Sequence, residues 1–109
     1  MKNLAAAAAF MAAVFTVATA LAADPQAGKQ KVTGTCAVCH GVDGIAKNPD
    51  APHLAGENAE YIIRQLKAFK SGERKHEQMS IVAQSLSDDD MANIAAWYSQ
   101  IKISVEVPK

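Results

Sequence analysis

The sequence predicts a small, all-helical protein on the strength of three observations. The chain has 109 residues, which allows one small domain. Apolar side chains recur at helical spacing in residues 57–71 and 87–101, and both stretches have helix-capping residues at their ends. Strand-like alternation occurs at residues 103–107, but a segment this short and terminal is more typical of a tail than of a paired strand.

The first 22 residues form a separate unit. They are almost entirely apolar, and Lys2 carries their only charge. A positive start, an apolar run over residues 4–18 and the small-residue site Ala20-Leu21-Ala22 are typical of a secretory signal peptide. We therefore expect residues 1–22 to be removed on export and residues 23–109 to act in the periplasm. The alternative is an uncleaved anchor, because residues 4–23 are about long enough to span a bilayer. The protein would contact a membrane only in that case.

The charge composition excludes two classes of function. The 11 Lys and Arg residues balance the 11 Asp and Glu residues, and the sequence pI is near 6.8. A strongly basic nucleic-acid binder and an acidic disordered tail both need a large excess of one charge. Without the apolar leader, few large apolar residues remain for a core. A domain this small usually needs a disulfide, a metal or a cofactor to be stable.

The mature chain is expected to begin with a short helix over residues 27–35. Asp24 and Pro25 are typical of a helix start. Gly28 and Gly34 lower the helix propensity, and such a glycine indicates that another backbone approaches closely. A flexible N-terminus is the alternative.

The motif that decides the chemistry lies at residues 36–40, which read C-A-V-C-H. C-x-x-C-H is the attachment signal for c-type haem. Thiols at Cys36 and Cys39 lie on one helical turn and can form thioethers with the two vinyl groups on one porphyrin edge. His40 then lies under the iron and offers an imidazole nitrogen as the proximal ligand.

Three other interpretations of the cysteines remain open. A disulfide between positions three apart closes a tiny loop and contributes little stability. A thioredoxin-like C-x-x-C needs a βαβ context, and no strand pattern precedes Cys36. A zinc site needs paired ligands, whereas His53 and His76 are single and widely spaced.

The rest of the chain alternates loops and helices. Residues 41–56 contain repeated Gly and Pro and are expected to form a loop that wraps the cofactor. The helix over 57–71 carries one apolar face and ends at Gly72. Residues 73–86 are expected to form a second loop. Ser87 and Asp90 have the spacing of a helix-capping pair at the start of the last helix.

The sixth iron ligand must come from a few candidates. Met79 lies in the expected second loop, which can bring its side chain over the far face of a flat ring. Met91 lies on the apolar stripe of the last helix, where methionine usually fills the core. His76 is the main rival to Met79, while His53 and an open site are further options.

Several motifs together resemble a class I c-type cytochrome. They are residues 36–41, Pro-His-Leu-Ala-Gly at 52–56, Met79, Leu-Ser-Asp at 86–88 and Ile-Ala-Ala-Trp-Tyr at 94–98. The chain is most similar to one half of the bacterial dihaem cytochromes of the c-four type, and a match at residues 61–74 extends the likeness. The resemblance implies three to four helices around one covalently bound haem c.

The resemblance also assigns roles to residues. It implies thioethers at Cys36 and Cys39, with His40 and Met79 as axial ligands of the iron. The carbonyl of Pro52 would accept a hydrogen bond from the other ring nitrogen of His40 and fix its tautomer. Two further expectations concern helix packing. Gly28 would let the first helix cross the last one near Trp97, and Val32 replaces an aromatic residue common in the family, which predicts a less well filled crossing.

These features predict a periplasmic single-electron carrier that is not an enzyme. No nucleophile, general base or phosphate loop is visible, and no small-molecule substrate is expected. The partners are redox proteins. A basic cluster within residues 64–75 could steer an acidic one, although a solvated helix face is the alternative. Two other functions stay open: an electron-transfer subunit of a larger dehydrogenase or oxidase, and a gas sensor with an open sixth site.

Overall fold

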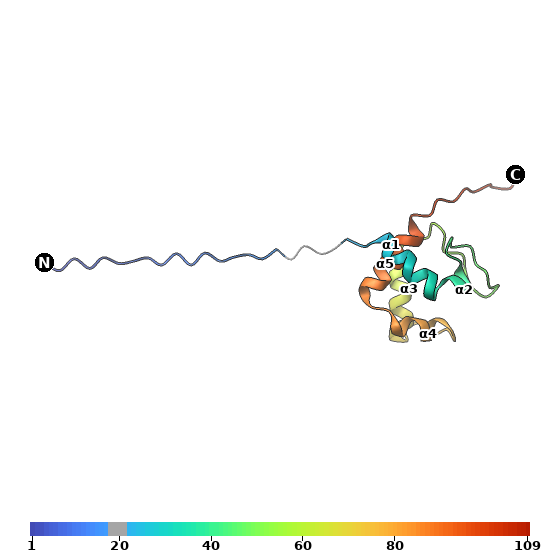
Figure 1. Ribbon diagram of the computed structural model, residues 1–109, viewed down its shortest axis with the longest axis horizontal. Helices are drawn as coiled ribbons and strands as arrows, with labels where there is room; N and C mark the ends of the chain where they lie inside the picture. Colours follow the sequence, from blue (N-terminus) through green and yellow to red (C-terminus); the bar gives the residue numbers. More distant parts are fainter. Residues whose placement is uncertain (18–21) are drawn as a thin grey trace.

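The computed structural model describes residues 1–17 and 22–109 (Figure 1). Its helices are α1 (Pro25–Thr35), α2 (Ala37–His40), α3 (Ala59–Ser71), α4 (Met79–Val82), the 3-10 helix η1 (Ala83–Ser85) and α5 (Asp88–Ser99). No strand occurs among the described residues, which confirms the all-helical prediction. Five α-helices replace the expected three to four because α2 and α4 are single turns of four residues.

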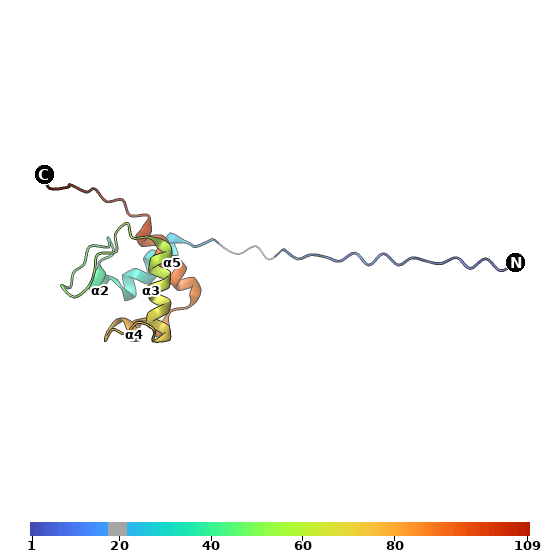
Figure 2. The same ribbon diagram turned by 180° about the vertical axis from the view of Figure 1, so that it is seen from behind.

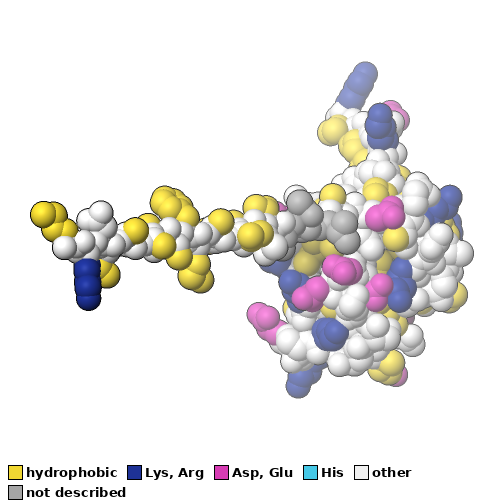
Figure 3. All heavy atoms as spheres, turned by 60° about the vertical axis from the view of Figure 1, so that its left-hand side comes forward, with side chains coloured by type: hydrophobic (Ala, Val, Ile, Leu, Met, Phe, Trp, Pro, Cys, Tyr) yellow, Lys and Arg dark blue, Asp and Glu magenta, His cyan; other side chains and the backbone are white. Residues whose placement is uncertain are grey.

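The N-terminal segment lies apart from the helices. Residues 1–17 are extended and exposed, with their apolar side chains uncovered (Figures 1 and 3). The expected cleavage site at Ala20-Leu21-Ala22 falls largely on residues 18–21, which lie outside the described residues. Within the part of the chain that is described, no helix is both long and apolar enough to cross a bilayer.

Helices α1 and α5 cross at Gly28. A Cβ placed on Gly28 would lie 1.9 Å from the carbonyl oxygen of Asn93, so only glycine allows this approach. The crossing lies near Trp97, as expected, because Asn93 is one turn before it in α5 and Lys29 Nζ lies 5.2 Å from the centre of the Trp97 ring. Val32 is fully buried there. The expectation of a less well filled crossing stays a prediction, because burial of Val32 alone does not measure how closely its neighbours pack.

Helix α3 lies along α5, and α4 packs near the C-terminal end of α3 (Figure 2). Asn58 caps α3 by accepting a hydrogen bond from the N–H of Tyr61, so the helix starts two residues later than expected. It ends at Gly72 in the left-handed conformation. The buried core gathers side chains from α1, α3, α5 and the segment before α5: Val32, Ile62, Leu66, Leu86, Met91, Ile94, Ala95 and Tyr98.

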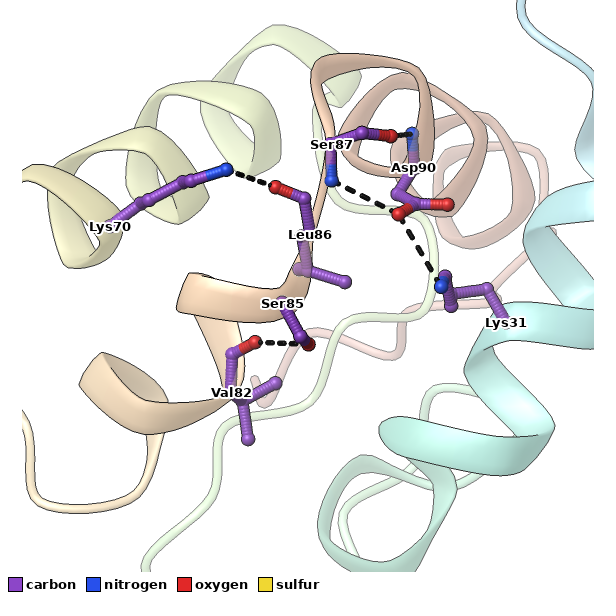
Figure 4. Close-up of polar contacts among 7 residues, drawn as sticks. All are labelled: Lys31, Lys70, Val82, Ser85, Leu86, Ser87 and Asp90. Atoms are coloured by element: carbon purple, nitrogen blue, oxygen red, sulfur yellow. Dashed lines mark hydrogen bonds and ion pairs between the residues drawn. The ribbon is translucent and has the colours of Figure 1, made fainter.

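The segment before α5 differs from the expected loop. Residues 79–85 form α4 and η1, each too short to produce a recognisable apolar period in the sequence. The capping box predicted for α5 is present, with reciprocal 3.0 Å bonds between Ser87 and Asp90 (Figure 4). Asp90 also pairs with Lys31 of α1 at 3.4 Å. Helix α5 ends at Ser99, two residues before the expected end, and residues 103–109 have no regular structure, as expected of a tail.

Candidate functional site

The two cysteines lie on one turn at the junction of α1 and α2. The N–H of Cys36 donates to the carbonyl of Val32 at 2.9 Å and closes α1. The N–H of His40 donates to the carbonyl of Cys36 at 2.9 Å and forms α2. Both thiols are free and half-buried, so the structure holds no disulfide between them. The turn places two thiols and one imidazole within five consecutive residues.

The environment of Cys36 differs from that of a redox-active thiol. Burial raises the pKa of its thiol to about 11, although the nearby charge of Lys31 lowers it. Thioredoxin-like cysteines instead have a lowered pKa and follow a strand. The zinc interpretation also finds no support. Nowhere in residues 1–17 and 22–109 do three His, Cys, Asp or Glu side chains gather closely enough to hold a metal ion.

His40 ends α2 and is only 7% exposed. Its Nδ1 lies 2.9 Å from the carbonyl oxygen of Pro52. A carbonyl oxygen can only accept, so Nδ1 carries the proton and donates it to this bond. In the neutral ring, Nε2 is then unprotonated and keeps a lone pair that can bind a metal.

The other ring nitrogen of His40, Nε2, is not completely enclosed by the protein. Among the described residues, no fully buried side-chain nitrogen or oxygen lacks a hydrogen-bond partner. The one partner found for the ring is Pro52, at Nδ1. Nε2 is therefore accessible although the rest of the side chain is buried. A buried, oriented imidazole with an accessible lone pair beside two free thiols is the donor set that covalent haem needs.

Two aromatic residues of α5 fix the loop that follows the motif. The indole Nε1 of Trp97 donates to the carbonyl of Val42, and the hydroxyl of Tyr98 donates to the carbonyl of Gly41, both at 2.8 Å. Burial raises the pKa of Tyr98 above its usual range, so the hydroxyl keeps its proton for this bond. Sequence reasoning missed these roles. The available signal was a pair of aromatic residues with polar groups on the buried side of a helix.

The same loop carries Pro52 back to His40. Gly41 adopts a φ of +74°, where a Cβ would lie 2.5 Å from the carbonyl oxygen of Ile45. The N–H of Leu54 then donates to the carbonyl of Gly44 at 2.8 Å. These bonds fold residues 41–54 back on themselves and place the Pro52 carbonyl beside the ring. The loop predicted from the glycines and prolines is thus confirmed.

Met79 is the first residue of α4, not a loop residue as expected. It is half-buried and packs against the same core as Cys36. Ile81, two residues further along α4, is 73% exposed. Val38, within the cysteine motif, is 85% exposed. Uncovered apolar side chains therefore occur beside both the cysteine turn and the methionine turn. Exposed apolar side chains of this kind fit contact with a large apolar cofactor.

The other candidate ligands have different surroundings. The Nδ1 of His76 accepts hydrogen bonds from the backbone N–H groups of Gln78 and Met79, both at 3.2 Å. The Nδ1 of His53 accepts one from Ala46 at 2.9 Å. Both rings are exposed. Met91 is fully buried in the core, as predicted.

Comparisons with known proteins agree with this geometry. The family profile described as cytochrome c matches residues 25–102. Cytochrome c-554(548) of Halomonas halodenitrificans is 46% identical over 81 residues, which cover 72% of this chain and 96% of that protein. The solved cytochrome c4 of Acidithiobacillus ferrooxidans superposes with a TM-score of 0.66 at 32% identity, covering 77% of this chain and 53% of that one.

A third relative has a more specific name. The thiosulfate dehydrogenase electron acceptor of Stutzerimonas stutzeri is 36% identical over 69 residues, covering 61% of this chain and 32% of that protein. The chain also spans less than half of the curated cytochromes c4 that it matches. With the C-x-x-C-H turn, the oriented His40 and these matches together, the chain belongs to the cytochrome c family of electron carriers and binds haem c covalently through Cys36 and Cys39.

Proposed function

We propose that this chain is a periplasmic single-electron carrier whose haem iron is bound by His40 and Met79. When bound, the haem exchanges one electron between its ferrous and ferric states. His40 supplies Nε2, and the Pro52 carbonyl keeps its ring oriented through the bond to Nδ1. Met79 supplies a soft thioether, which favours the ferrous state and raises the potential relative to a second histidine.

The observation that carries this proposal is the 2.9 Å contact between His40 Nδ1 and the Pro52 carbonyl. It leaves Nε2 unprotonated and accessible in a side chain that is otherwise buried. Met79 is a half-buried thioether that packs against the core. His76 is a weaker candidate because its Nδ1 already accepts two backbone hydrogen bonds.

The ligand assignment can be tested with a matched pair of methionine variants. In the ferric protein a Met–iron bond gives a near-infrared charge-transfer band. We expect Met79→Ala to lose this band, to lower the reduction potential and to admit carbon monoxide in the ferrous form. Met91→Ala should keep the band, because Met91 is fully buried in the core. Persistence of the band in Met79→Ala would show that another methionine is the ligand, and absence of the band from the unchanged protein would show that no methionine is.

We further propose that residues 1–22 are a signal peptide and that the mature protein is residues 23–109. The composition of residues 1–22 and their extended, exposed course through residue 17 support this division. Mass spectrometry of the protein from the periplasmic fraction should find Ala23 at its N-terminus. A full-length protein in the membrane fraction would instead support an anchor.

Redox partner proteins are expected for any electron carrier, and the charges suggest what kind they are. The basic cluster comprises five residues at the C-terminal part of α3 and just after it: Arg64, Lys67, Lys70, Arg74 and Lys75. None of them pairs with a carboxylate among the described residues. We therefore propose an acidic partner. Electron transfer to it should slow as salt rises, and charge reversal at Lys67 and Lys75 should slow it at low salt.

A second candidate function is an electron-transfer subunit of a larger dehydrogenase or oxidase. The relative named as a thiosulfate dehydrogenase electron acceptor favours it. A stable partner that copurifies with the native protein would support this function over a free carrier. A gas sensor would need an open sixth site, and carbon monoxide binding to the unmodified ferrous protein would support it. We expect no enzymatic activity from the chain alone.

A further inference from the structure

The side chain of His76 is tied to the backbone that begins α4. Its Nδ1 accepts hydrogen bonds from the N–H groups of Gln78 and Met79, both at 3.2 Å. Its own N–H donates to Ser80 Oγ, and its carbonyl accepts from the Ser80 N–H, both at 3.0 Å. His76 therefore makes four hydrogen bonds to the three residues centred on Met79.

His76 also connects this turn to α3. Its ring meets the ring of Phe69 edge-on, with centroids 6.3 Å apart and planes at 70°. Phe69 is buried, and the guanidinium of Arg74 lies 4.6 Å from the centre of its ring. The position of the His76 ring is thus set by a residue anchored in the core.

The alternative anchors of Met79 are weaker. Helix α4 is one turn long, and its N-cap residue, Gln78, makes no side-chain cap bond. The first N–H groups of a helix need acceptors from outside the helix. His76 Nδ1 supplies such an acceptor to the N–H groups two and three residues ahead of it, the offsets at which a capping Ser, Asp or Asn side chain usually accepts.

From these contacts we propose that His76 is the positioning residue for Met79. Its Nδ1 holds the Met79 backbone in place, so that the thioether keeps a fixed position toward the iron. This proposal rests on the proposed ligation by Met79. It also gives His76 a role other than the rival ligand that the sequence suggested.

The test compares variants by how easily added imidazole displaces Met79 from the iron of the ferric holoprotein. The near-infrared band measures the fraction that keeps Met79. Losing two backbone hydrogen bonds at a helix start should let His76→Ala reach half-displacement at about tenfold lower imidazole. His76→Asn offers an oxygen acceptor near the position of Nδ1 and should stay within about threefold of the parent.

His53→Ala is the matched control. His53 is also exposed, and its Nδ1 also accepts a backbone N–H, but in the loop of residues 41–56 rather than beside Met79 in the sequence. It should leave the displacement midpoint unchanged. If His76→Ala does not accumulate as holoprotein, His76→Leu keeps apolar bulk against Phe69 while removing the acceptor, and it replaces the alanine variant.

Amide hydrogen exchange in the reduced holoprotein tests the His76 hydrogen bonds separately from their effect on the bond between Met79 and the iron. His76→Ala should lower protection at the Gln78 and Met79 amides, whatever the ligand is. Lower protection with an unchanged imidazole midpoint would overturn the positioning role. An asparagine variant as easily displaced as the alanine variant would overturn it too.

Failure of the ligand assignment gives a different pattern. If another methionine were the ligand, the band would persist in Met79→Ala; if no methionine were the ligand, the unchanged protein would lack the band. If His76 were itself the ligand, both His76→Ala and His76→Asn would lose the low-spin spectrum, while Met79→Ala kept it.

Discussion

The close contact between α1 and α5 at Gly28 predicts that Gly28→Ala destabilises the fold. A methyl group added at Gly28 would lie 1.9 Å from the carbonyl oxygen of Asn93, whereas ordinary contact begins at 3.4 Å. The oxygen belongs to the backbone of α5 and the position of the methyl is fixed by the backbone of α1, so neither can rotate away. Gly28→Ala therefore forces α1 and α5 apart by more than 1 Å, which opens the packing around Val32.

The two energetic effects of this substitution have opposite signs. Overpacking a closed backbone contact costs about 3 kcal/mol. Replacing glycine by alanine within a helix returns about 0.5–1 kcal/mol. We expect Gly28→Ala to lower the free energy of unfolding by about 2 kcal/mol. In a domain of this size that corresponds to a melting temperature roughly 8–16 °C lower.

Gly34 in the same helix provides the control. A Cβ at Gly34 has no atom within 4 Å, so Gly34→Ala meets no steric cost. Its helix propensity alone should raise stability by about 0.5–1 kcal/mol. Thermal unfolding of both ferric holoproteins, followed by circular dichroism at 222 nm, measures the difference. Gly28→Ala as stable as Gly34→Ala would refute the argument that the backbone contact limits this position.

Three further predictions concern the core and its connections. Met91→Ala leaves a cavity at a fully buried site and should lower the free energy of unfolding, measured in urea, by about 2–5 kcal/mol. A loss under about 1 kcal/mol would mean that neighbouring side chains move in to fill the cavity. Tyr98→Phe leaves the Gly41 carbonyl without its donor and should cost about 1–3 kcal/mol, whereas an unchanged midpoint would show that water replaces the hydroxyl. The N–H of Ser87 lowers the pKa of Asp90, so its carboxylate stabilises the fold above the unfolded pKa of about 3.9, and this contribution is lost as pH falls through the lower folded pKa. Asp90→Asn should therefore flatten the acid side of a plot of melting temperature against pH, and an unchanged slope would contradict this.

Three of the helix ends could be predicted from the sequence because they depend on neighbouring residues. Asp24 accepts from the N–H two residues ahead, and Ser87 exchanges bonds with Asp90 three residues ahead. Gly72 ends α3 through its own φ of +83°. Each of these interactions lies within one helical turn, so residue types at fixed offsets are sufficient to predict it.

The site contains interactions of longer range, and these were harder to predict. Trp97 and Tyr98 bind carbonyls 55 and 57 residues away, a pairing that depends on how α5 docks on the motif. Pro52 came from family resemblance alone, since nothing in its local spacing indicates a contact with His40. Helix α4 was missed because one turn carries no period. His76 appeared only as a possible ligand, because its hydrogen bonds depend on the backbone course around Met79.

The two sides of the proposed iron site differ in how firmly they are held. On the His40 side, the ring is buried, the cysteines on its turn are bonded to the haem, and α5 holds the following loop with two hydrogen bonds. On the Met79 side, a one-turn helix is capped by an exposed histidine. Few buried contacts mean a low local free energy of opening. Perturbations that leave the fold intact should therefore release Met79 before they disturb His40, which makes the methionine side the place where this chain can tune its potential.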